Sequence, residues 1–446
     1  MLDGYIRIVS VLLALLSLVF ISTLLIQYRQ LYRKNMEGVD RNYHLQTMII
    51  MAMHLLSFVV LLNVYDFRKE IILLVIGEIG LLFVTNWLIQ QFFMKSLLPM
   101  WTVSQYLLVI SFVILTRLDL ELGIKQFYLA SAAYVLAFMV AGVYYRLNFI
   151  KYLGFPAIIV AIALLLMTNS TINGANNWLL IGQFSFQPSE IVKILYIVFL
   201  ASIFSLFSQH KFKAIIVAGI FTMTLTFIQV FQNDLGSALI YYVVYILMAY
   251  IYTSNRLYII GGGLVTLAAG YLAILEFSHV RVRIDAWLNP WADIDHKGYQ
   301  IAQSLFAIGN GGITGTGISL GQPNKIPVVP TDFIYSAILE EMGLIVGLCI
   351  IVAIVLFFIF GIQMIEKTRS EFDFLLASGL LIVYGFQSFL IIGGVTRAVP
   401  LTGVTLPFVS YGGSSLFTTF ILLGLLQGIK LSIKKHQRAY KKKITT

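Results

Sequence analysis

Long runs of apolar residues constrain this chain more than any other feature. An α-helix needs about 20 such residues to cross the hydrocarbon core of a bilayer. Runs of this length are found at residues 5–27, 46–64, 71–92, 101–117, 125–145, 150–168, 190–208, 213–231, 235–253, 257–275, 333–362, 373–396 and 410–432. The sequence therefore predicts an all-α polytopic membrane protein with thirteen spans. The first run lacks a small-residue cleavage site and is expected to be retained as a helix.

Composition excludes a soluble globular protein. Hydrophobic residues make up 59% of the 446 positions and charged residues only 11%, so a soluble fold would expose a large apolar surface. The net charge of +10 at pH 7 lies mostly in short loops and the C-terminal tail. This pattern is typical of a membrane topology signal and not of nucleic-acid binding. The single cysteine, Cys349, excludes an intrachain disulfide.

Basic residues predict the orientation of the chain. Arg33, Arg146 and Lys367 are among those that fall in every second loop, and the tail KKHQRAYKKK continues the series. The positive-inside rule places these loops and the C-terminus in the cytoplasm. With thirteen spans the N-terminus is then outside the cytoplasm. The polar loops expected on that outer face are 168–189, 232–234, 276–332 and 397–409.

The segment 276–332 interrupts the apolar pattern with clustered Gly, Pro and Asn, several carboxylates and several cations. Long loops of this kind are usually functional or disordered, and aromatic residues such as Trp287 and Phe306 argue against disorder. We interpret the segment as the active-site loop. Its glycine run, 309–317, lacks the preceding strand of a dinucleotide-binding motif. The run predicts instead a tight turn or a close approach of two backbones.

Five sequence blocks after residue 168 resemble one family in their order. They read GANNWLLIGQFSFQPSEIVK (174–193), QNDLGSALI (232–240), AWLNPW with GYQIAQSLFAIGNGGITGTG (286–317), PTDFIYSAILEEMG (330–343) and PLTGVTLPFVSYGGSS (400–415). This combination resembles the SEDS family (RodA/FtsW/SpoVE) of peptidoglycan glycosyltransferases. The resemblance implies a ten-helix core in residues 99–446, with about three extra transmembrane helices in residues 1–98. The chain departs from the family at Asn177, where Arg is usual, at Asn233, where Pro is usual, and in IPVVP, which shortens a Leu-Pro-Glu-x-His motif.

The resemblance also implies a reaction. Lipid II is polymerised at the outer face of the cytoplasmic membrane, for cell elongation, division or sporulation, and a class B penicillin-binding protein is the expected partner beside the membrane lipids. An acceptor 4-hydroxyl attacks the anomeric carbon of the donor, and undecaprenyl pyrophosphate leaves. Because cations stabilise this leaving group, one carboxylate base with Arg or Lys groups, or with a divalent ion such as Mg²⁺ or Mn²⁺, is sufficient. Cys and His show no metal-ligand spacing.

Asp332 stands where the long loop gives way to a helix. An Asp at such a position commonly caps the helix N-terminus, whereas the resemblance assigns it the role of catalytic carboxylate and general base; the two roles are compatible. Ser336 and Glu340 follow at i+4 and i+8, so all three are expected on one helical stripe, with Glu340 about 12 Å along the helix. Glu340 and Glu341 are equally explained as ties to Arg or polar groups on neighbouring helices.

Further site candidates are charged or polar residues of the outer face. The cations expected to contact the pyrophosphate are Arg283, Lys325 and Arg397, although such residues also bind lipid headgroups. Lys193 is a fourth candidate, but Glu190 three residues earlier makes a local salt bridge an equal explanation. Asp234 opens a helix and is expected to cap it before serving a site. The polar residues that complete the predicted set are Gln300, Ser304, Glu340 and Ser414.

Two other functions stay open. A lipid II flippase would place charged residues on broken helices at mid-membrane, whereas the polar motifs here gather on one face and favour the enzyme. A scaffold that recruits a class B penicillin-binding protein is compatible with either. His54 and Glu78 lie within apolar spans, where ionisable residues are candidates for function, although a helix–helix contact explains them as well.

Overall fold

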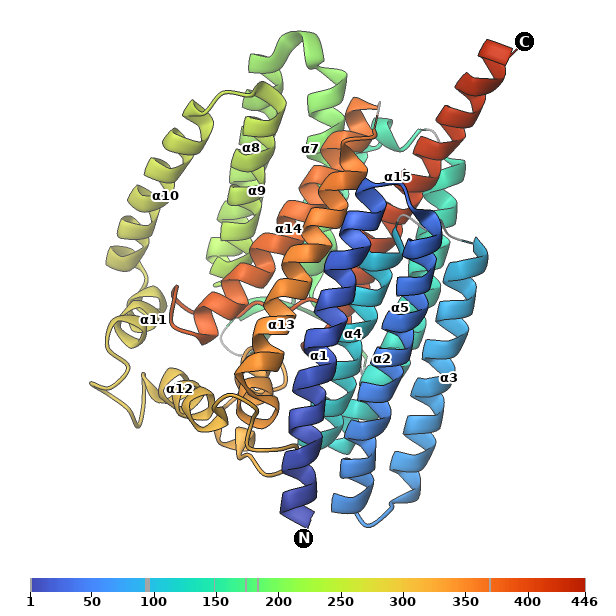
Figure 1. Ribbon diagram of the computed structural model, residues 1–446. Coiled ribbons are helices and arrows are strands. Elements are labelled where there is room, and N and C mark those ends of the chain that lie inside the picture. Colours follow the sequence, from blue (N-terminus) through green and yellow to red (C-terminus); the bar gives the residue numbers. More distant parts are fainter. Residues whose placement is uncertain are drawn as a thin grey trace.

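The computed structural model describes residues 2–92, 97–147, 149–172, 175–182, 184–368 and 370–445, and the side chains of the basic tail after Ile433 lie outside this description. The helices are α1 (Leu2–Tyr32), α2 (Met36–Val64), α3 (Lys69–Phe92), α4 (Leu98–Leu118), α5 (Leu120–Arg146), α6 (Gly154–Leu166), α7 (Pro188–Leu206), α8 (Lys211–Phe231), α9 (Leu235–Thr253), α10 (Leu257–Glu276), α11 (Ser278–Leu288), α12 (Tyr299–Gly311), α13 (Ile334–Ile365), α14 (Glu371–Val395) and α15 (Gly413–Thr445). Figure 1 shows them as one bundle, in which α1 begins and α15 ends at opposite ends.

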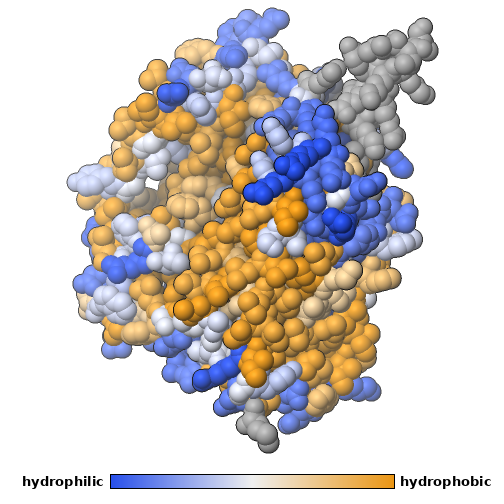
Figure 2. All heavy atoms as spheres, in the orientation of Figure 1, coloured by the Kyte–Doolittle hydropathy of each residue, from blue (hydrophilic) through white to orange (hydrophobic). Residues whose placement is uncertain are grey.

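Twelve of the described helices are long and apolar enough to cross a membrane. The prediction of thirteen full-length spans is therefore wrong at residues 150–168, where α6 has only 13 residues. At about 1.5 Å per residue it is roughly 20 Å long, shorter than the roughly 30 Å of a hydrocarbon core. The apolar run was long enough, but its ends form a 3₁₀ turn, Ile150–Tyr152, and the approach to a small sheet. Hydrophobic side chains form a band between hydrophilic ends, as Figure 2 shows.

Two of the predicted outer loops contain secondary structure of their own. Residues 168–189 form a three-stranded antiparallel sheet of β1 (Ser170–Ile172), β2 (Ala175–Ile181) and β3 (Phe184–Phe186). The all-α prediction holds for the rest of the described chain and is incomplete here. Segment 276–332 contains α11, α12 and a 3₁₀ turn, Pro323–Lys325, so it is a partly helical cap over one end of the bundle.

Helix α4 lies at the centre of the bundle, and every residue from Leu98 to Thr116 on it is buried. The predicted extra helices pack around it: α1 contacts α2 and α13, and α2 contacts α4. Between α2 and α3, His54 Nε2 lies 3.3 Å from Glu78 Oε2, and both side chains are fully buried. This pair confirms the explanation of His54 and Glu78 as residues of a helix–helix contact.

The glycine run closes a break in α13. Gly343 interrupts that helix with φ 86° and ψ 172°, which frees backbone groups of the helix ladder. Leu344 N donates to Gly312 O at 3.0 Å, and a Cβ on Gly315 would overlap the carbonyl oxygen of Glu341. Segment 311–317 is therefore a re-entrant turn against α13, as the sequence predicted, and it satisfies backbone groups that hydrocarbon cannot.

Candidate active site

The four polar outer loops meet at one end of the bundle. Asn177 Nδ2 of β2 donates to Asp234 Oδ2 before α9 at 2.6 Å. Ser414 Oγ, at the start of α15, accepts from the backbone N of Gln187 before α7 at 3.0 Å. The 397–412 loop joins the long segment where Tyr411 N donates to Pro330 O at 2.8 Å. The predicted convergence of these loops is confirmed.

Asp332 lies in the turn before α13, outside the helix. The N-cap of α13 is Phe333, which has no capping side-chain hydrogen bond, so the alternative explanation of Asp332 as the cap of this helix does not hold. Because α13 begins at Ile334, Asp332 also does not belong to the helical stripe of Ser336 and Glu340. Its turn is closed by Asp332 N donating to Val328 O at 3.2 Å, with Val328 at φ 58°.

The side chains of Asp332 and Arg283 both approach Gly403. A Cβ built on Gly403, which has φ 73°, would be 3.5 Å from Asp332 Oδ2 and 4.0 Å from Arg283 Nη2. Arg283 Nη1 also donates to Leu401 O at 3.4 Å. Burial raises the pKa of Asp332, against the hydrogen bond of Thr331 and the charge of Arg283, which lower it. The carboxylate and the guanidinium therefore both approach Gly403, which has no side chain of its own to fill the space there.

The other predicted cations lie in different surroundings. Arg397, at φ 63° after α14, donates from Nε to Trp287 O at 2.8 Å and from Nη2 to Leu288 O at 2.6 Å. It therefore joins the end of α14 to the end of α11, and it also lines a cavity of about 450 Å³ there. Lys325 lines a separate cavity together with Glu340. No hydrogen bond or ion pair among the described residues joins Arg397 or Lys325 to Asp332.

Lys193 and Glu190 form a buried ion pair on α7. Lys193 Nζ lies 2.9 Å from Glu190 Oε2, with side-chain exposures of 1% and 7%. Lys193 Nζ also donates to Gln387 Oε1 on α14 at 2.7 Å, and Gln387 Nε2 donates to Thr405 O at 2.9 Å. Thr405 Oγ1 in turn bonds Ser415 Oγ on α15 at 2.6 Å. This network fixes the loop that carries Gly403 to three helices.

Asp234 is the N-cap of α9, as predicted, with Oδ1 accepting from Ser237 N at 3.0 Å. Its Oδ2 accepts from Asn177 and from the hydroxyls of Ser237 and Ser189. Asn177 stands where the resembling family has Arg, so here a neutral amide contacts this carboxylate. Through these hydrogen bonds Asp234 connects β2, α7 and α9, which is a structural role.

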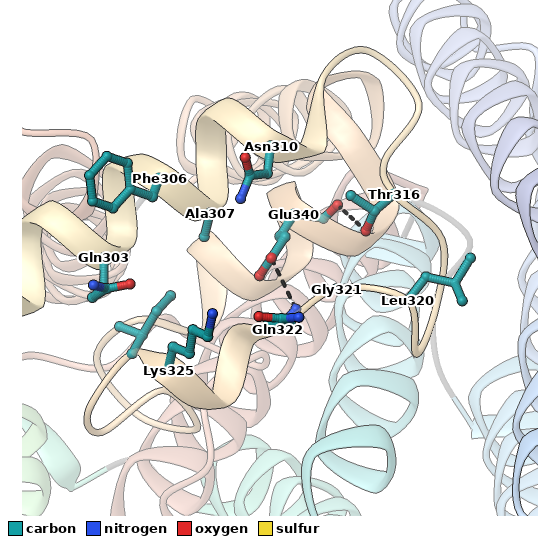
Figure 3. A pocket seen from close by; sticks show the side chains of 11 residues that line it. Gln303, Phe306, Ala307, Asn310, Thr316, Leu320, Gly321, Gln322, Lys325 and Glu340 are labelled. Atoms are coloured by element: carbon teal, nitrogen blue, oxygen red, sulfur yellow. Dashed lines mark hydrogen bonds between the residues drawn. The ribbon is translucent and has the colours of Figure 1, made fainter.

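Of the residues predicted on α12, Ser304 is fully buried and has structural contacts. Its Oγ bonds Ser336 Oγ on α13 at 2.7 Å and Val395 O on α14 at 3.1 Å. Gln300, in the first turn of α12, is partly exposed, and no hydrogen bond among the described residues joins it to Asp332. Glu340 lies at the base of the cavity beneath α12, which Figure 3 shows.

Several polar residues of the site were missed by reasoning from the sequence. Arg117, the last charge of α4, donates from Nε to Glu341 Oε1 at 2.7 Å and from Nη2 to Gly321 O at 3.0 Å. This confirms the tie expected for Glu341, although its partner was not predicted. Gln387 had a usable signal as a polar residue within an apolar span. Gly403 and Thr405 lie in a recognised block but were not singled out.

Comparisons with known proteins agree with the resemblance. The family model for FtsW, RodA and SpoVE, described as "Cell cycle protein", matches residues 100–435. The peptidoglycan glycosyltransferase RodA of Mycobacterium bovis is 39% identical over 303 residues, 62% of either chain. The probable peptidoglycan glycosyltransferase FtsW of Geobacter sulfurreducens is 38% identical over 269 residues, 58% of this chain and 71% of that relative. The chain thus spans less than two thirds of the mycobacterial relative.

Solved structures share the fold. A chain of a peptidoglycan synthase complex, described as coordinating polymerization and crosslinking, superposes with a TM-score of 0.62 at 24% identity, over 75% of this chain and 97% of that one. The rod shape determining protein RodA of Thermus thermophilus superposes with a TM-score of 0.52 at 23% identity, over 74% and 95%. At these identities the likeness shows a common architecture.

Proposed function

The chain belongs to the FtsW/RodA/SpoVE family of cell cycle proteins, and from this premise we propose that it is a peptidoglycan glycosyltransferase that polymerises lipid II. The observation that carries the proposal is that Asp332 and Arg283 both approach the position that a Cβ of Gly403 would occupy. The names of the relatives support the reaction class. The alternative of a flippase lacks a comparable feature, since this pair lies among the outer loops.

In the proposed reaction Asp332 is the general base. Its carboxylate accepts the proton of the acceptor sugar's 4-hydroxyl while that oxygen forms a bond to the anomeric carbon of the donor. The bond from that carbon to the pyrophosphate breaks, and its electron pair leaves with the phosphate oxygen. Because burial raises the pKa of Asp332, the carboxylate is a stronger base than an exposed aspartate.

Arg283 is proposed to stabilise the charge that develops on the leaving pyrophosphate. The described residues contain no group of three or more His, Cys, Asp and Glu side chains able to hold a metal. A divalent ion at this site would therefore need ligands from the substrate. Mg²⁺ is often bound through one or two carboxylates together with substrate phosphates. Asp332 would then be its protein ligand, and the ion would supply further stabilisation of phosphate charge.

The proposal places the protein in the cytoplasmic membrane with its N-terminus outside and its C-terminus in the cytoplasm. The twelve apolar helices support the membrane location. The start of α1 and the end of α15 lie at opposite ends of the bundle, with the short apolar helix α6 in addition to the twelve, and the basic loops support the orientation. Residues 1–98 are proposed as helices added to a family core of residues 99–446. A class B penicillin-binding protein is the proposed partner, and the similarity to a chain of a peptidoglycan synthase complex supports this choice.

The test is polymerisation of purified lipid II by the purified protein, wild type and Asp332→Asn. Asn keeps the size of the side chain and removes the base, so the rate should fall by about 10²–10⁴-fold while the protein stays folded. Asp295→Asn, an exposed aspartate of the same segment, is the matched control and should keep its activity. Glycan formation by Asp332→Asn at the wild-type rate would show that the base lies elsewhere. Transport of lipid II across liposomes without product would identify a flippase.

A further inference from the structure

A second polar cavity lies beneath α12, apart from the Asp332 and Arg283 pair. Its volume is about 630 Å³, and α12, the 316–326 loop and the first turns of α13 contribute its walls. Figure 3 shows the side chains of Asn310, Glu340 and Lys325 converging on it. Asn310 and Lys325 are exposed while Glu340 is 4% exposed, so the cavity opens outward and has a carboxylate at its base.

Glu340 has one hydrogen-bonded oxygen and one free oxygen. Oε1 accepts from Gln322 N at 3.0 Å, whereas Oε2 is buried and has no hydrogen-bond partner. A buried polar atom of this kind carries a desolvation cost unless a ligand or water satisfies it. No ion pair among the described residues engages Lys325, although its ammonium reaches into the same cavity. The cavity therefore holds an unsatisfied acceptor and an available donor.

We propose that this cavity binds the glycan strand that grows at the neighbouring site, through the uncharged hydroxyl and acetamido groups of its sugars; the inference rests on the proposed polymerase function. A sugar hydroxyl both donates and accepts, so it can donate to Glu340 Oε2 and accept from Lys325 Nζ. The amides of Gln303 and Asn310 suit further hydroxyl and acetamido groups. One negative and one positive side chain disfavour ligands of high net charge of either sign.

The position of the cavity suits a strand and not only a single sugar. Ser304 on α12 bonds Ser336 on α13, and Glu340 lies one helical turn further along α13 from Ser336. The walls are therefore fixed to the helix that follows Asp332 directly. Gly321 allows the loop to approach closely, because a Cβ there would be 2.8 Å from Glu341 Cγ and 3.1 Å from Glu340 Cδ.

The first test measures binding of oligomers of N-acetylglucosamine, which are uncharged glycan oligomers without lipid or peptide, to the full-length protein in detergent. Glu340→Gln keeps an oxygen for Gln322 N and removes the charge, and should weaken binding by about tenfold, as expected for loss of a charged hydrogen bond. Gln303→Ala guards against misfolding, because the Gln303 side chain is partly exposed and makes no hydrogen bond among the described residues; this variant should weaken binding as well. Asn324→Ala, exposed and outside the cavity, should bind like the wild type. Equal binding by all three variants would overturn the proposal.

The second test follows strand length during polymerisation of lipid II. Glu340→Gln should release shorter strands than Asn324→Ala does, because it binds the product strand more weakly. A raised KM for lipid II with unchanged strand length would assign the cavity to the lipid-linked sugar and refute a strand site. Displacement of the glycan oligomer by free stem peptide would assign it to the peptide and also refute the proposal. Wild-type protein that binds glycan oligomers but makes no glycan would refute the polymerase and leave the saccharide site standing.

Discussion

Replacing Lys193 by Met tests whether the buried network of α7 is what holds the active-site loop. Met matches the length of the Lys stem and removes only the ammonium. Glu190, whose side chain is 7% exposed, then keeps a charge with no cation beside it, and Gln387 loses the donor to its Oε1. Removal of one partner of a buried ion pair typically costs about 3–5 kcal/mol, mostly because the other charge stays buried and unpaired.

This origin of the cost predicts how a second substitution behaves. Glu190→Gln together with Lys193→Met removes both charges, so the double variant should be more stable than Lys193→Met alone. A double-mutant cycle then gives a coupling energy well above that of independent sites. The control is Lys125→Met on α5, whose ion pair with Glu121 at 2.6 Å is largely exposed and should contribute little.

The assay is equilibrium unfolding in mixed detergent micelles, followed by circular dichroism, with polymerisation measured on the same samples. Lys193→Met should lose stability, and its folded fraction should show a lower kcat, because Gln387 no longer fixes the loop at Thr405. If Lys193→Met is as stable as Lys125→Met, the buried network does not stabilise the fold. A normal kcat with a raised KM would instead identify Lys193 as a substrate contact.

Three further outcomes are expected. Arg283→Gln removes a charge that lowers the pKa of Asp332. This pKa should therefore rise further, and the acidic limb of the pH–rate profile should move to higher pH. An unchanged acidic limb would show that Arg283 does not influence the ionisation of Asp332. Arg117→Met strips the cation from the fully buried Glu341, and amide hydrogen exchange in the adjoining loop should quicken, whereas unchanged exchange would show that the ion pair is dispensable. A cysteine placed by Glu37→Cys should react with a membrane-impermeant reagent only from the cytoplasmic side, and labelling from outside alone would reverse the proposed orientation.

The sequence was sufficient for the fold where hydropathy alone decides it. Most spans follow directly from runs of about 20 apolar residues, and the glycine run identified the re-entrant turn because Gly permits that approach. It failed at α6, where an apolar run of full length ends in a sheet, since hydropathy does not reveal where a helix stops. Antiparallel β2 and β3 (Ala175–Ile181 and Phe184–Phe186) were read only as polar loop.

For the site, the family blocks indicated which loops matter and could not indicate which side chains meet. Asp332 and Arg283 were both singled out and both approach Gly403, whereas the alternative of a helix cap at Asp332 fails, because the turn at Val328 precedes the start of α13. Long-range partners such as Arg117 and Glu341 are 224 residues apart, and no local pattern connects them. The burial of Lys193 could not be predicted from the sequence either, since its i+3 spacing from Glu190 fits an exposed ion pair as well.

The hydrogen bonds of the outer cations decide which of them is available to a substrate. Arg397 uses Nε and Nη2 on two carbonyls of α11, and Lys193 is already paired with a carboxylate. Within the described part of the chain Arg283 makes a single long hydrogen bond, from Nη1 at 3.4 Å, and its Nη2 approaches the same glycine as Asp332. A guanidinium whose N–H groups are not already hydrogen-bonded can bind a phosphate through two parallel hydrogen bonds. Lys325, separated in the second cavity, is better suited to hydroxyl groups, so the positive charge that the pyrophosphate meets at Asp332 should come from Arg283.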